Sequence, residues 1–133
     1  MFSVTSFAEL RRDALDAERH NRFHPTDRPR VPYVRECLGD RPGPFVAATD
    51  YVKLVPDQIR EWVPGRYVVL GTDGFGRSDA RAALRRHFEV DRYHIAVAAL
   101  KALADERKID VATVSAAMQK FGIDPAIPNP ITV

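Results

Sequence analysis

The residues best placed to do chemistry lie in a glycine-rich loop, Gly71–Asp79, between an apolar run, Tyr67–Leu70, and a predicted helix. Glycine lets the backbone approach a ligand closely, and a helix start offers free N–H groups to an anion. Neither familiar phosphate-binding pattern is present, because Asp79 stands where G-x-G-x-x-G needs glycine and no Gly-Lys-Ser/Thr occurs. The carboxylates of Asp73 and Asp79 would also repel an anion. These residues favour a tight structural turn, and they leave ligand binding and a domain or subunit contact open.

Histidine and cysteine show no metal-binding or nucleophilic pattern. His20 and His24 are four residues apart, but Pro25 indicates that the helix ends there, and no H-E-x-x-H motif occurs. His24 and His87 could line a cleft, although surface hydrogen bonding is the simpler interpretation. The single cysteine, Cys37, cannot form an internal disulfide and fits a reducing cytoplasm. The residues alone therefore predict no catalytic side chain and no metal site.

Length and composition limit the classes of protein to which the chain can belong. A chain of 133 residues with 45% hydrophobic residues has room for one domain with a real core, residues 1–133. Twenty basic and 18 acidic residues give a net charge of +2, which does not suggest a nucleic-acid-binding protein. No apolar run approaches the ~20 residues of a membrane span, and the N-terminus lacks a signal-peptide pattern. We expect a cytoplasmic protein that binds neither nucleic acid nor membrane.

Hydrophobic periodicity predicts an α/β fold with a mostly parallel sheet between layers of helices. Phe2–Thr5 is strand-like, and Ser6 with Glu9 forms a capping box that starts the first helix. Two continuous apolar runs are typical of buried parallel strands. The predicted strands span 45–49 and 67–70, and the predicted helices 7–20, 33–38, 55–63, 80–88, 93–107 and 111–121. The proline-containing tail, 123–133, is expected to lie extended on the surface.

Long strings of residues give the chain a resemblance to a known family. Gly71–Asp79, continued through Arg81, Leu84, Arg85 and the string His87-Phe88-Glu89-Val90-Asp91, is similar to a stretch of the homodimeric-type pyruvate dehydrogenase decarboxylating component of bacteria. Ala48–Leu54 and Lys120–Asp124 fit the same family, as do Ser3–Phe7 and the Pro-Arg-Val-Pro-Tyr string that ends at position 33. The resemblance covers nearly the whole chain in order.

The resemblance implies a transketolase-like C-terminal domain. In that family, thiamine diphosphate and Mg²⁺ are held by the preceding domains across a dimer interface, so it implies no cofactor, metal or catalytic residue on this chain. The complete enzyme would decarboxylate pyruvate and pass the acetyl group to a lipoyl arm of the acyltransferase component. The family's domain begins earlier, with a strand and a helix before the counterpart of Phe2. We therefore expect the sheet to lack an internal strand that another polypeptide completes, and the chain alone to be inactive.

Within this family the glycine-rich loop is the candidate border of the active site or contact between subunits, with Arg77 pairing with a carboxylate across the interface. Two other hypotheses stay open: a subunit of a split 2-oxo acid decarboxylase or ketolase in specialised metabolism, and a stand-alone docking module. The candidate residues for this border or interface are Asp73, Gly74, Phe75, Gly76, Arg77, Ser78, Asp79 and His87.

Overall fold

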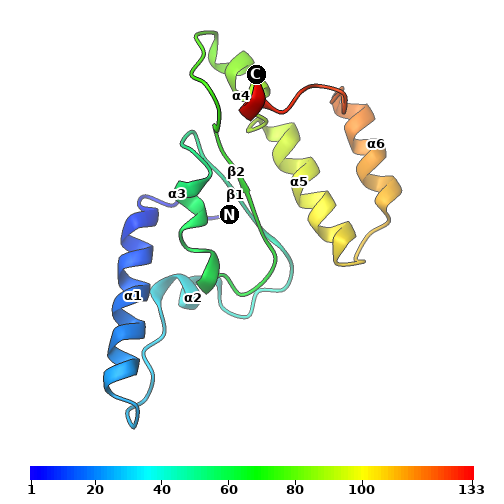
Figure 1. Ribbon diagram of the computed structural model, residues 1–133. Helices are drawn as coiled ribbons and strands as arrows, with labels where there is room; N and C mark the ends of the chain where they lie inside the picture. The colour runs from blue at the N-terminus through cyan, green and yellow to red at the C-terminus, as the bar shows by residue number, and fades with distance from the viewer.

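Residues 1–133 are described by a computed structural model, in which helices lie on both sides of a small sheet (Figure 1). Strands β1, Phe45–Ala48, and β2, Tyr67–Leu70, pair in parallel. Both are the continuous apolar runs expected of buried parallel strands. The predicted α/β class with a parallel sheet is confirmed, and the sheet contains these two strands only.

The first helix, α1, spans Phe7–Phe23, which confirms the prediction and extends it by three residues. Its first turn is capped by Ser6, whose Oγ accepts a hydrogen bond from the Glu9 N–H at 3.2 Å. The second half of the predicted capping box is absent, because the Glu9 carboxylate pairs with Arg12 instead of reaching back to Ser6. The last helical residue is Phe23, and the capping residue His24 precedes a proline.

The segment Phe2–Thr5 forms no strand, so that prediction is wrong. Its backbone makes no hydrogen bond with β1. An extended segment becomes a strand only where a neighbour supplies a hydrogen-bonded ladder, and these residues instead line a groove beside β1.

The connection from β1 to β2 contains two short helical pieces, α3, Leu54–Asp57, and η1, Arg60–Trp62. The sequence predicted one helical face over residues 55–63, and this is wrong. Pro56 lies in the first turn of α3, where proline is tolerated, and the helical geometry is interrupted at Ile59, with φ −103° and ψ 4°.

A small core forms where α1, the short helix α2, Tyr33–Leu38, and the β1–β2 connection meet one face of the sheet. Trp62 is its largest member, and its indole Nε1 donates to the Glu18 carboxylate at 2.7 Å. Only 12 of 133 residues are buried, so the loss of one large core side chain removes much of the packing. The core cluster consists of Ala14, Val34, Ile59, Trp62 and Val63.

The second half of the chain is helical, with α4, Arg81–His87, α5, Arg92–Asp105, and α6, Val111–Phe121. These predictions are confirmed, and α5 packs between the sheet and α6. The tail is not simply extended: it ends in η2, Pro130–Thr132, with Pro130 buried. In the view of Figure 1, this end of the chain overlaps α4. No helix here combines the length and apolar character needed to cross a bilayer.

Ionisation of Tyr67 in β2 is expected to lower the stability of the chain at alkaline pH. Burial raises its pKa to about 12, the Asp57 carboxylate adds to the effect, and the hydroxyl donates to the Pro56 carbonyl at 2.9 Å. Because the pKa is raised above its ordinary value of 10.0, this contribution is present below pH 10 and is lost as pH rises toward 12. We expect the free energy of unfolding to fall across that window, with a smaller fall in Tyr67→Phe, as measured by urea denaturation. An equal fall in both proteins would contradict the assignment.

Candidate functional site

The base of the glycine-rich loop is fastened to the segment that follows β1. Asp73 accepts a hydrogen bond from the Lys53 N–H at 2.8 Å, and the Thr72 hydroxyl donates to the Asp50 carbonyl at 3.0 Å. Gly71 is required by close approach, because a Cβ there would lie 2.7 Å from the Tyr51 carbonyl oxygen. Both segments leave the carboxyl ends of parallel strands, the edge where ligands and contacts gather in such folds.

The rest of the loop, Gly74–Asp79, is exposed throughout, and we call it the tip. The Phe75 side chain is 77% exposed, and nothing lies within 4 Å of a Cβ added at Gly76. Arg77 forms no ion pair with any residue of the chain. Asp79 is already engaged, because its carboxylate accepts from the Ala80 N–H at 2.6 Å. The tip therefore presents one aromatic ring and one free guanidinium.

His87 lies close to the tip, where it lines the same hollow as three of the tip residues. Arg77, Ser78 and Asp79 form one side of a hollow of about 380 Å³, and His87 with Leu84 of α4 lies on another side. Asp73 does not line this hollow. Its carboxylate accepts the hydrogen bond from the Lys53 N–H at the base of the loop. The hollow has mixed charge, so it does not have the electrostatics of a dedicated anion site.

The C-terminal tail packs against the tip, a contact that the sequence did not predict. Gly74 has φ 111°, and a Cβ at this position would lie 2.5 Å from the Pro130 carbonyl oxygen. Asn129 caps η2 by accepting from the Ile131 N–H at 3.1 Å. The Asn-Pro pair signals a turn in the sequence, but nothing in it indicates that the turn contacts residue 74.

Replacing Gly74 with alanine is expected to destabilise the chain by about 2–4 kcal/mol, because positive φ and the Pro130 contact both oppose a Cβ. Thermal unfolding followed by circular dichroism measures the change. Gly76→Ala is the matched control: its φ is not positive and its surroundings are open, so we expect a change within about 1 kcal/mol. Equal effects in both variants would contradict the packing of the tail on the tip.

A second feature is the unpaired edge of β1. The N–H groups of Phe45 and Thr49 donate toward β2, at 2.7 Å to Arg66 and 3.1 Å to Leu70. Alternation along a strand therefore turns the N–H and C=O groups of Val46 and Ala48 to the opposite edge.

A groove of about 1030 Å³ runs along this edge. Every residue of 45–49 lines it, whereas β2 contributes Tyr67 alone. Successive side chains of a strand point to opposite faces, so a groove lined by five consecutive residues follows the strand's edge and not one of its faces. The two-stranded sheet fits the expectation, drawn from the resemblance, that the sheet of this chain is incomplete.

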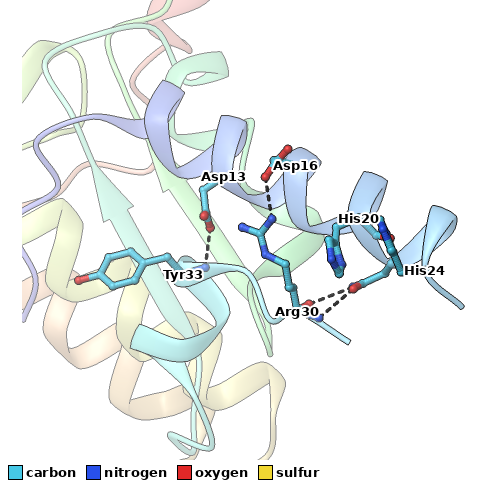
Figure 2. A network of polar contacts seen from close by, with 7 residues as sticks. Asp13, Asp16, His20, His24, Arg30 and Tyr33 are labelled. Carbon is cyan, nitrogen blue, oxygen red and sulfur yellow. Dashed lines mark hydrogen bonds and ion pairs between the residues drawn. The ribbon is translucent and has the colours of Figure 1, made fainter. Parts of the chain in front are cut away.

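The polar network at the end of α1 is structural and lies at the opposite end of the view from the tip (Figure 1). Figure 2 shows Arg30 paired with Asp16 at 2.8 Å and the rings of His20 and His24 stacked, with centroids 4.2 Å apart. These contacts hold the loop after α1 against the helix. His24, considered above as a cleft residue, is exposed here, and no group of three His, Cys, Asp or Glu residues could hold a metal ion.

The sequence is similar to one family of known proteins over most of its length. Residues 1–91 match the family model described as the transketolase-like TK C-terminal domain, and the chain belongs to that family. The chain is 57% identical over 132 residues to the pyruvate dehydrogenase E1 component of Pseudomonas aeruginosa, which covers 98% of the chain and 15% of that protein. It is 53% identical to the same component of Cupriavidus necator, covering 100% of the chain and 15% of the relative, and 53% identical to that of Escherichia coli, covering 98% and 14%. The resemblance to the decarboxylating component is confirmed, and the chain spans about 15% of the length of these curated relatives.

Proposed function

We propose that this chain is the transketolase-like C-terminal portion of a pyruvate dehydrogenase decarboxylating component and serves its assembly. The observation that supports this most strongly is 53–57% identity over almost the whole chain to proteins of that name. The complete enzyme removes CO₂ from pyruvate and transfers the acetyl group to the lipoyl arm of an acyltransferase component, as a homodimer in the cytoplasm.

In this proposal the chain contributes to the structure of the enzyme and supplies no catalytic group. Thiamine diphosphate and Mg²⁺ belong to the remaining domains, where the cofactor supplies the electron sink for decarboxylation. The loop's own carboxylates hold its backbone: Asp73 accepts from Lys53 and Asp79 from Ala80. The loop Asp73–Asp79, together with His87, borders the contact with those domains or the entrance to the active site.

The open edge of β1 supports an assembly role. The N–H and C=O groups of Val46 and Ala48 have no partner strand, and the adjoining groove is lined mostly by hydrophobic residues. Exposed strand edges of this kind invite pairing with another chain segment. A strand from the remaining domains would fill the groove and satisfy these groups.

The test is turnover of pyruvate with thiamine diphosphate and Mg²⁺, measured as CO₂ release with an artificial electron acceptor. The chain is assayed alone, and then mixed with the remaining domains as a separate polypeptide. We expect activity only in the mixture. Activity from the chain alone would overturn the proposal, and activity of the mixture with another 2-oxo acid but not with pyruvate would replace the proposed substrate.

A further inference from the structure

The tip combines two features found together at the centres of protein interfaces. Phe75 is 77% exposed, and the Arg77 guanidinium has no carboxylate partner in the chain. Exposed aromatic rings and arginines are enriched among the residues that contribute most to association. The pair on one short loop makes the tip a candidate contact surface.

The arginines in and around the tip are only partly paired within the chain. Four arginines occur between residues 77 and 86, and two of them are engaged: Arg85 pairs with Asp50, and Arg86 donates to the Gly122 carbonyl. Arg77 and Arg81 remain free. A complementary surface therefore carries carboxylates, since an unpaired guanidinium would be costly to bury.

The Gly74 end of the tip is anchored in the isolated chain. The base is tied to the segment after β1, and Pro130 of the tail packs against Gly74. Within the tail, the Thr132 hydroxyl donates to the Asn129 carbonyl at 2.8 Å, which holds η2 together. Because a preformed loop loses less conformational entropy on binding, this bracing favours association.

We propose that the tip is a docking element, braced by the C-terminal tail, whose partner offers an apolar socket for Phe75 and a carboxylate for Arg77. The partner is the surface of the remaining domains of the enzyme, so the inference rests on the proposed function. A small anion fits less well, because the hollow beside the tip includes the Asp79 carboxylate and the apolar side chains Ala83 and Leu84.

The test is the Kd between the chain and the remaining domains, measured by isothermal titration calorimetry. We expect Phe75→Ala and Arg77→Ala each to raise the Kd about 30-fold. Val111→Ala and Arg11→Ala are matched controls, because Val111 is 65% exposed on α6 and Arg11 is exposed on α1 without an ion pair. Both controls should bind as the unaltered chain does.

A chain ending at residue 128 tests the brace without changing Phe75 or Arg77. We expect this variant to keep its helical circular dichroism, to exchange amide hydrogens faster over residues 74–79, and to bind about tenfold more weakly. Unchanged exchange would overturn the brace.

The outcomes separate the two proposals. If the unaltered chain binds and the tip variants bind equally well, docking by the tip is overturned while the proposed function stands. If the unaltered chain does not bind the remaining domains, both are overturned. Protection of residues 74–79 from exchange by inorganic phosphate, but not by those domains, would make the tip an anion site and also overturn the docking element.

Discussion

Replacing Ala48 with proline is expected to abolish restoration of activity by the chain while leaving its own fold intact. The Ala48 N–H points to the unpaired edge of β1, so proline removes no hydrogen bond to β2, and edge strands tolerate proline. The same ring would occupy the position where an added strand places its carbonyl group. We expect a loss of about 3 kcal/mol in association, which is about 100-fold in Kd, and a change in unfolding free energy within about 1 kcal/mol.

Ala47→Pro is the matched control for that experiment, since the substitution is identical and the residue is adjacent. The alternation set by Phe45 and Thr49 places the Ala47 N–H in the ladder with β2. This variant should lower the stability of the isolated chain by about 3 kcal/mol, as measured by urea denaturation. If Ala48→Pro assembled with the remaining domains as well as the unaltered chain does, no strand would add to this edge. If the two variants were equally unstable, the assigned direction of the N–H groups would be wrong.

The helices were predictable because their signals are local. Ser6, Asp91 and Asp110 each precede a helix and accept a hydrogen bond from an N–H of its first turn, and Gly122 ends α6 with φ 61°. The errors occurred where the structure depends on contacts distant in sequence or where a helical pattern is interrupted without a local signal. Phe2–Thr5 has the composition of a strand but no ladder to join, and the backbone leaves helical geometry at Ile59, which divides one helical pattern into two pieces.

The site was predictable only in part, for a related reason. The glycine pattern located the loop, and its strand and helix neighbours fixed its place at the carboxyl end of β2. The burial of Pro130 against Gly74 joins residues more than 50 positions apart, and neither residue type signals the other. The resemblance predicted an incomplete sheet but not that the groove would lie along the edge of β1, and the apolar run 45–49 by itself does not show which edge lacks a partner.

Apolar side chains of the second half of the chain are only partly buried. The helix α5 is apolar on most sides from Ile95 to Leu103, yet Ala102 is its one buried residue. A helix that is apolar all round is typical of a protein interior. With only 12 of 133 residues buried and an apolar groove along β1, the chain alone is expected to have a narrow margin of stability. In the proposed assembly, the remaining domains would cover part of this apolar surface.

Replacing Trp62 with alanine is therefore expected to unfold most of the isolated chain at 25 °C. Trp62 is 8% exposed within the core cluster, and removal of a buried tryptophan costs about 3–5 kcal/mol. The substitution also leaves the Glu18 carboxylate without its indole donor. Circular dichroism with urea denaturation measures the effect.

Two variants serve as controls. Trp62→Phe, which keeps a ring but loses the hydrogen bond, should have a smaller effect. Leu15→Ala, at an exposed position on α1, should change the free energy of unfolding by less than about 0.5 kcal/mol. If Trp62→Ala recovered helical signal and a cooperative transition on mixing with the remaining domains, the added strand would be shown to supply the missing packing. If the isolated variant were as stable as the unaltered chain, the cluster around Trp62 would not be the core.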